Sequence, residues 1–236
     1  MKVEIWSDIV CPFCYIAKRN FERALGRFEH RAHVAIIWKS FQLNRHLVTT
    51  PGKNLDEYLA EIKGCTLSHA REMNNHVTLL AEKAGLEYNL DRAVVANSFN
   101  AHRLMHLAEK SGCQDQLAEL LFKAYFTDGK NIADRETLVS IGSEAGIEKG
   151  KITHVLEGND FSEQVAEDMS EARQYRIHGV PHFILNGSIA VSGAQDPEVF
   201  LDALDKSWKM QDGSEIAEQE TPGDGTVCAP GEECEE

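Results

Sequence analysis

Two cysteines, Cys11 and Cys14, are the residues of this chain whose type and spacing are best suited to chemistry. A Cys-x-x-Cys pair beside a strand-helix unit is typical of proteins that exchange disulfides. The same spacing supplies half of a zinc ribbon, but a zinc site needs two more Cys or His ligands, and the sequence has no second Cys-x-x-Cys. We therefore interpret the pair as redox-active and expect no metal. Inert packing of the two thiols is the remaining alternative.

The flanking residues predict the elements that position these thiols. A β-branched and aromatic run over residues 3–10 indicates a buried strand. After Cys14, apolar residues recur at spacings of three and four, which predicts an amphipathic helix. Cys11 then lies at the helix N-terminus, where free N–H groups and the helix dipole favour a thiolate. Pro12 suits the first helical turn, and Pro12 and Phe13 are uncharged candidate substrate contacts.

The composition indicates a globular chain with an acidic end. With 236 residues and 42% hydrophobic content, the chain can bury a sizeable core. Its formal net charge is −14, and residues 211–236 contain nine acids and no Lys or Arg. Neither part has the basic surface that binding to nucleic acid or an anionic membrane requires. No apolar run could span a bilayer and no signal peptide is visible, so we expect a cytoplasmic protein with reduced thiols.

The order of predicted elements indicates the fold class. Residues 33–43 form a second buried strand, which gives a β-α-β unit with parallel strands and a right-handed crossover. From about residue 54 to 177 the apolar spacing is helical almost throughout. Strands resume at His182, turn at Asn186-Gly187, a type I′ hairpin signal, and lead to a last helix with Pro197 in its first turn. We predict an α/β fold whose β-α-β and β-β-α halves flank a large all-helical insertion.

Three motifs within this order resemble those of one family. They are Ser-Asp-Ile-Val-Cys-Pro-Phe-Cys, Asn-Ser-Phe-Asn-Ala-His-Arg and Gly-Val-Pro-His-Phe, at residues 7–14, 97–103 and 179–183. A Cys-x-x-Cys that opens the first helix of such a β-α-β, β-β-α order resembles the thioredoxin fold, and the inserted helices resemble its DsbA branch. Together the motifs look like the FrnE-type, DsbA-like thioredoxin proteins, over residues 1 to about 208.

The resemblance implies a thiol-disulfide oxidoreductase or isomerase whose partners are protein disulfides. Cys11 would attack the substrate sulfur and Cys14 would resolve the mixed disulfide. Pro181 matches the family's cis-proline, which faces the two sulfurs, and Val180 would offer its backbone to an extended substrate. No bound cofactor is implied, only a thiol donor such as glutathione or a thioredoxin-type reductant. Oxidase, reductase and isomerase share these residues and differ in potential.

We expect three parts in the chain. They are a discontinuous thioredoxin-like domain, an inserted helical domain and an acidic, disordered tail, over residues 1–50 with 178–210, 51–177 and 211–236. Cys228 and Cys234 in the tail flank a Pro-Gly turn and are a candidate second redox pair for the first. A solvated tail with incidental thiols is the alternative.

Three further residues are candidates for tuning the site. His178 and His182 flank Val180-Pro181, and as a cation either would stabilise a Cys11 thiolate. A surface histidine at a strand start is an equal alternative. Asp8 is expected to be a turn or cap residue. The alternative is that it accepts the proton of Cys14.

Two other functions stay open on the same fold. The kappa-class glutathione transferases and 2-hydroxychromene-2-carboxylate isomerases resemble this domain plan, bind glutathione and usually have Ser where Cys11 stands. The presence of both Cys11 and Cys14 argues against that branch. The other hypothesis is a non-catalytic redox sensor, in which the tail cysteines report oxidation to a partner.

Overall fold

Within residues 1–212, which the computed structural model describes, four strands form one mixed sheet in the order β2-β1-β3-β4. β1 and β2 run parallel, and β3 runs antiparallel to both of its neighbours. The elements in chain order are β1 (Lys2–Ser7), α1 (Pro12–Arg27), η1 (Arg31–His33), β2 (Ala35–Ser40), α2 (Leu55–Lys63), α3 (Leu67–Lys83), α4 (Phe99–Lys110), α5 (Gln114–Phe126), α6 (Arg135–Glu144), α7 (Lys149–Glu157), α8 (Ser162–Gln174), β3 (His182–Leu185), β4 (Ile189–Ser192) and α9 (Pro197–Asp212).

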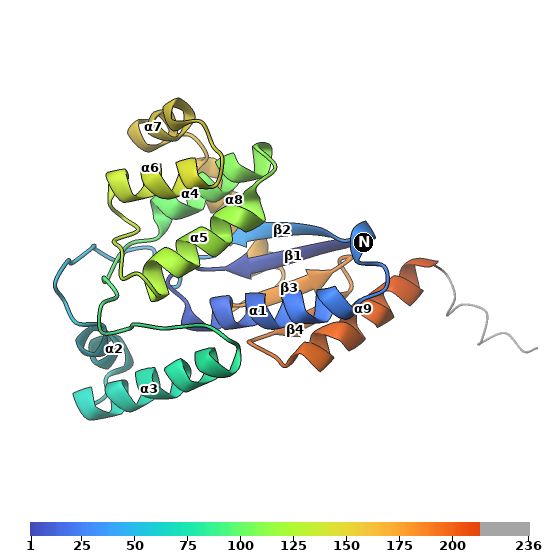
Figure 1. The fold of residues 1–236 in the computed structure, drawn as a ribbon, viewed down its shortest axis with the longest axis horizontal. Coiled ribbons are helices and arrows are strands. Elements are labelled where there is room, and N and C mark those ends of the chain that lie inside the picture. Colours follow the sequence, from blue (N-terminus) through green and yellow to red (C-terminus); the bar gives the residue numbers. More distant parts are fainter. Residues whose placement is uncertain (213–236) are drawn as a thin grey trace, which may run out of the picture.

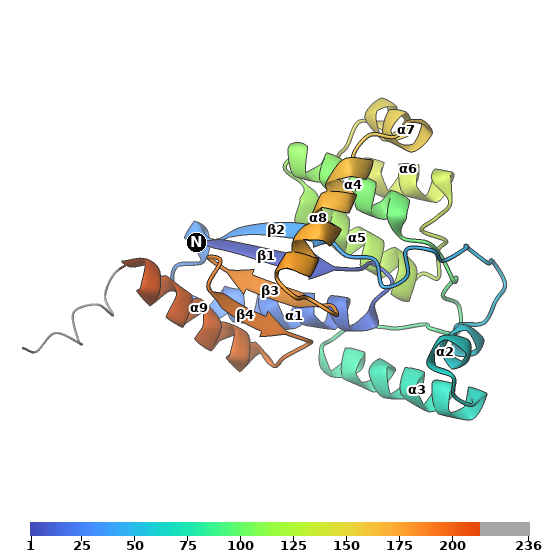
Figure 2. The ribbon, with the colours of Figure 1, turned by 180° about the vertical axis from the view of Figure 1, so that it is seen from behind.

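Helices cover both faces of this sheet. Two opposite views show α1 and α9 together on one face and α8 crossing the other (Figures 1 and 2). Side chains of β1 alternate accordingly: Ile5 belongs to the same buried cluster as Phe21 and Phe200, whereas Trp6 packs in a second cluster with Ala172 of α8. Because both faces are covered, β1 is buried from Val3 to its end.

The inserted helices form two groups. α4 to α8 pack on one another, and α4, α5 and α8 contact β2, whereas α2 and α3 form a separate helical hairpin beside the start of α1 (Figure 1). The predicted class, a thioredoxin-like α/β fold with a large helical insertion, is confirmed. No helix within residues 1–212 has the length and apolar character to cross a membrane.

Both N-terminal strands are shorter than the apolar runs that predict them. β1 ends at Ser7, three residues before the end of its run, because the chain turns at Asp8, whose side chain accepts a hydrogen bond from Val10 N. β2 covers residues 35–40 instead of 33–43. Its last pairing, from Phe41 N to Ser7 O at 3.0 Å, lies where the partner strand stops. The boundaries are therefore fixed by the turn into α1, which apolar periodicity does not encode.

The hairpin between β3 and β4 confirms the turn predicted from Asn186-Gly187. Both residues have positive φ, 47° and 71°, as a type I′ turn requires. Asn186 also pairs with Lys2 through two hydrogen bonds, Asn186 N to Lys2 O at 2.8 Å and Lys2 N to Asn186 Oδ1 at 2.7 Å. The turn therefore holds the second half of the fold against the first strand.

A buried polar cluster around Asp168 joins α8 to β2 and α4. Its carboxylate accepts hydrogen bonds from Ser40 N at 2.7 Å and faces His106 Nε2 at 3.1 Å and Lys39 Nζ at 3.2 Å. Burial acts to raise the pKa of Asp168, but the His106, Ser40 and Lys39 interactions outweigh it and lower that pKa below its usual value. The charged carboxylate is therefore a stabilising element of the fold.

We expect Asp168→Asn to lower the free energy of unfolding by about 3 kcal/mol, because it leaves buried donors with a neutral partner. Because the folded pKa is lowered, this stability is present above the unfolded pKa and lost as pH falls through the folded value. Urea unfolding at pH 7 and at pH 4 and below measures the effect, which should shrink at acid pH. Asp91→Asn, at an exposed position, is the control, and equal losses in both variants would contradict the role of the cluster.

Candidate active site

Cys11 lies where the chain turns from β1 into α1. Asp8 O accepts a hydrogen bond from Cys11 N, and Cys11 O accepts one from Cys14 N, both at 3.0 Å. The Cys11 thiol faces the loop before β3 and donates to Val180 O at 3.5 Å. The following peptide bond, Val180–Pro181, is cis. The fold thus places the Cys11 sulfur against a backbone segment 169 positions away in sequence.

Cys14 lies one helical turn further on and is the more deeply enclosed thiol. Its residue is 1% exposed, and burial together with the neighbouring Cys11 thiol raises the pKa of Cys14 well above its usual value. Cys11 is 3% exposed but forms part of the wall of a cavity. The arrangement suits Cys11 to meet a substrate sulfur first, with Cys14 protonated behind it.

For the disulfide exchange expected from the sequence, the raised pKa of Cys14 predicts how the second step would depend on pH. Attack by Cys14 on a mixed disulfide at Cys11 needs the thiolate, whose fraction rises about tenfold per pH unit below the pKa. We expect the rate constant for this release step to rise about tenfold per unit from pH 6 to pH 8, without levelling off. Acid quench and mass spectrometry of the transient Cys11 adduct measure it. A plateau below pH 7 would contradict a Cys14 pKa raised by burial.

Asp8 is a turn residue, as its position suggests, and its buried carboxylate also connects three segments. The side chain accepts hydrogen bonds from Val10 N at 3.4 Å and from Leu43 N at 2.8 Å. His102 Nε2 of α4 lies 3.3 Å from Asp8 Oδ1. One carboxylate therefore fixes the loop that carries Cys11, the loop after β2 and the inserted helices relative to one another, which makes Asp8 a positioning residue.

We expect Asp8→Asn to lower the free energy of unfolding by about 2–3 kcal/mol. Both carboxylate oxygens of Asp8 accept hydrogen bonds from backbone N–H groups, and in asparagine one of these oxygens is replaced by an NH2 group, which cannot accept. The change should also slow exchange at Cys11, since the loop loses an anchor. Urea unfolding and thiol-dependent disulfide reduction, measured on the same preparations, test both effects. Unchanged stability and rate would show that the three segments are held without this charge.

The other candidate residues are placed less favourably for tuning a thiolate. His182 is half-buried, its Nδ1 lies 2.7 Å from Ser192 Oγ, and burial lowers the pKa of His182. Burial therefore disfavours the cationic imidazole of His182, and a tuning role for this residue stays a prediction. His178 is exposed in the loop before Val180. Cys228 and Cys234 lie outside the described residues, so the tail redox pair stays a prediction.

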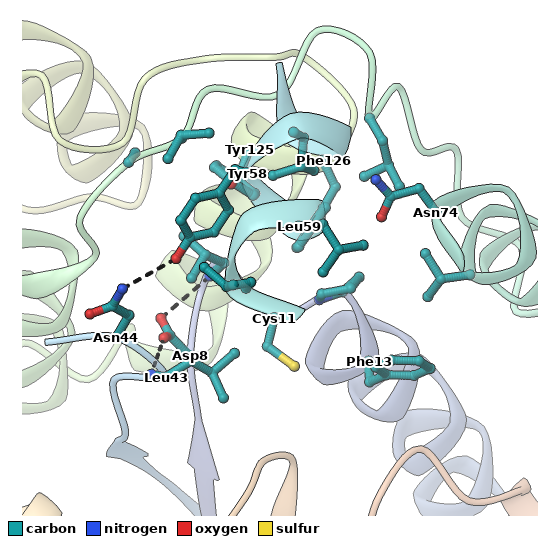
Figure 3. A pocket seen from close by; sticks show the side chains of 18 of the residues that line it. Asp8, Cys11, Phe13, Leu43, Asn44, Tyr58, Leu59, Asn74, Tyr125 and Phe126 are labelled. Carbon is teal, nitrogen blue, oxygen red and sulfur yellow. Dashed lines mark hydrogen bonds between the residues drawn. The ribbon is translucent and has the colours of Figure 1, made fainter. Parts of the chain in front are cut away.

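An apolar cavity of about 640 Å³ opens beside Cys11. Figure 3 shows it between the Cys11 loop and α2, with the Cys11 sulfur at its edge between Asp8 and Phe13. Phe13, 41% exposed, lies at the rim, and Pro12 belongs to the wall. The two residues proposed from sequence as substrate contacts therefore both border this space.

Sequence reasoning missed the residues that the insertion brings to the site. Tyr58 and Leu59 of α2 line the same cavity as Cys11. Tyr88 donates a hydrogen bond from its hydroxyl to Pro12 O at 2.6 Å and so supports the first turn of α1. The apolar spacing of α2 was a signal, but such spacing ordinarily predicts a face packed in the core and not the wall of a cavity.

Comparisons with known proteins agree on one family. A model described as a DSBA-like thioredoxin domain matches residues 2–205. The crystal structure of a probable DsbA oxidoreductase from Streptomyces coelicolor is 32% identical, with a TM-score of 0.83 over 98% of this chain and 97% of that chain. The uncharacterized protein YwbO of Bacillus subtilis (strain 168) is 25% identical over 212 residues, which are 89% of this chain and 98% of YwbO.

A more distant structure has the same fold. The structure of a 2-hydroxychromene-2-carboxylate isomerase is 14% identical, with a TM-score of 0.64 over 91% of this chain and 99% of that chain. At this identity the likeness concerns the fold alone, and the fold hosts more than one chemistry. Function has to be argued from the residues of the site.

Proposed function

Because the chain belongs to the DsbA-like thioredoxin family, we propose that it is a thiol-disulfide oxidoreductase that acts on protein disulfides through Cys11 and Cys14. The observation that carries the proposal is the Cys11 thiol at the start of α1, facing Val180 O at 3.5 Å, with the buried Cys14 thiol behind it. A nucleophilic thiol, a backbone segment for an extended substrate and a resolving thiol are what disulfide exchange needs.

In the reducing direction, the Cys11 thiolate attacks one sulfur of the substrate disulfide. The Cys11–substrate bond forms, the substrate disulfide breaks, and one substrate thiolate leaves and takes up a proton. Cys14 then loses its proton and attacks the Cys11 sulfur, which releases the second substrate thiol and leaves a Cys11–Cys14 disulfide. Two electrons have passed to the substrate, and a thiol donor such as glutathione or a thioredoxin-type reductant restores the dithiol. The reverse sequence oxidises a substrate dithiol.

Reduction of insulin by a thiol donor tests the proposal. We expect the full chain to accelerate precipitation of the insulin B chain well above the rate with donor alone. Equilibration with glutathione buffers of known ratio then gives the reduction potential and hence the favoured direction. Insulin reduction at the donor's own rate, by protein whose Cys11 and Cys14 are shown to be reduced, would contradict the proposal.

The glutathione-dependent alternative makes a different prediction about Cys14. A transferase or isomerase that activates glutathione with one side chain has no chemical use for a second thiol one turn along the helix. Turnover of an electrophile with glutathione that survives Cys14→Ser would favour that alternative. A sensor without catalysis would be favoured by a protein partner that binds only the oxidised chain.

A further inference from the structure

The cavity beside Cys11 is lined mostly by apolar side chains. A protein substrate needs access to the Cys11 sulfur and a backbone to pair with at Val180. Residues 178–182 are not among those that line the cavity, whereas Tyr58 and Leu59 of α2 are (Figure 3). Its volume of about 640 Å³ lies within the range of sites that enclose whole small molecules.

Helix α2 contributes apolar side chains to the wall of the cavity. None of its residues is fully buried, although Leu55, Leu59 and Ile62 follow the spacing of a buried helical face. These side chains line the cavity where a core helix would contact other side chains. An apolar occupant would therefore remove from water a surface that the fold leaves accessible.

Three polar side chains of the lining, Asn44, Tyr58 and Asn74, already have hydrogen-bond partners within the protein. Asn44 Nδ2 donates to the Tyr58 hydroxyl at 3.4 Å, and Asn74 Nδ2 donates to Asp56 Oδ1 at 2.6 Å. A polypeptide threaded into the cavity would bury backbone N–H and C=O groups with few partners, which is unfavourable. The basic residues of the lining, Lys63 and His76, are exposed. The interior thus matches an apolar group better than a peptide or a multiply charged molecule.

We infer that this cavity binds the aromatic group of a second class of substrate, a low-molecular-weight disulfide with an aromatic ring near one sulfur. The inference rests on the proposed function, because the same Cys11 sulfur performs both reactions. The Cys11 thiolate attacks the sulfur that bears the aromatic group, and the other half leaves as a thiolate. Cys14 loses its proton to solvent and attacks Cys11, which releases the aromatic thiol and forms the Cys11–Cys14 disulfide. A thiol donor of the glutathione class returns the two electrons.

Three disulfides that share a non-aromatic hydroxyethylthio half test the inference. The other half is naphthylmethyl, hydroxyethyl or glutathionyl, and acid quench with chromatography follows consumption of each disulfide by the reduced full chain. Rate constants are divided by those of free glutathione, which corrects for intrinsic reactivity. We expect the naphthylmethyl compound to react at least about tenfold faster than the hydroxyethyl compound, and the glutathionyl compound to show no such gain.

The outcomes separate the two proposals. Equal corrected rates for the naphthylmethyl and hydroxyethyl compounds would overturn the inference and leave the proposed function standing, because Cys11 would still react. A glutathionyl compound faster than both would also overturn it, in favour of a polar tripeptide site. Reaction of all three compounds at the background rate of Cys11→Ser would overturn the inference and the proposed function together.

Substitutions on α2 locate the effect. Leu59→Asp places a charge in the cavity and Leu59→Trp fills it, so both should lower the naphthylmethyl to hydroxyethyl ratio at least about fivefold. Glu57→Gln, on the exposed side of the same helix, is the matched control and should keep the ratio. One substitution adds a charge and the other adds apolar volume, so a lower ratio in both variants is not explained by misfolding of α2 in one of them. An unchanged ratio in both Leu59 variants would place the aromatic group elsewhere and overturn the inference.

Discussion

Replacing Cys11 with serine is expected to remove disulfide exchange. Reduction of insulin should fall to the rate of the thiol donor alone, a loss of at least about a hundredfold, because a serine hydroxyl is not ionised near neutral pH and forms no disulfide. Cys11 lines the cavity, so replacing its sulfur with the smaller serine oxygen should disturb the packing little. Insulin turbidity, measured at equal concentrations of folded protein, gives the result directly.

The control for this change is another thiol of the chain. Cys113 precedes α5 as its N-cap residue and makes no side-chain capping bond, and serine is well suited to that position. Cys113→Ser should therefore fold and keep its activity. Loss of activity in Cys113→Ser, or retention of activity in Cys11→Ser, would contradict the assignment of the nucleophile.

The strands, helices and hairpin of the fold follow from local signals in the sequence. Alternating burial in β1, the three- and four-residue spacing of α1 and the Asn186-Gly187 turn are each encoded within a few residues. The end of β1 at Ser7 is not encoded in this way. It depends on Asp8, whose partners Leu43 and His102 come from distant parts of the chain.

The candidate site likewise has one part that the sequence predicts and another that only the folded chain shows. Cys11 and Cys14 lie three positions apart in the sequence and were predictable from that spacing, and the resemblance to a family added the Val180-Pro181 segment. The cavity was not predictable, because its walls come from the Cys11 loop, α2, α3 and the segment before α4, and only the folded chain brings them together. The apolar face of α2 carries the same pattern whether it packs against side chains or encloses empty space.

Replacing Cys14 with serine is expected to stop the reaction halfway. Cys11 still attacks, but without a resolving thiol the mixed disulfide with the substrate accumulates, and insulin reduction falls at least about tenfold. Mass spectrometry of the intact chain after exposure to a disulfide substrate should show one adduct that dithiothreitol removes. The variant with both Cys11 and Cys14 replaced by serine is the control and should show no adduct at this position.

The same experiment also tests whether the tail thiols take part. Cys228 and Cys234 are the other pair in the sequence that could attack a Cys11 adduct, so Cys14→Ser is examined with and without serine at both tail positions. An adduct that accumulates equally in both backgrounds assigns resolution to Cys14 alone. An adduct that persists only when the tail thiols are absent would make the tail a second resolving pair. Turnover of Cys14→Ser at the full rate in both backgrounds would contradict the dithiol mechanism, because Cys11 would then act as a single thiol.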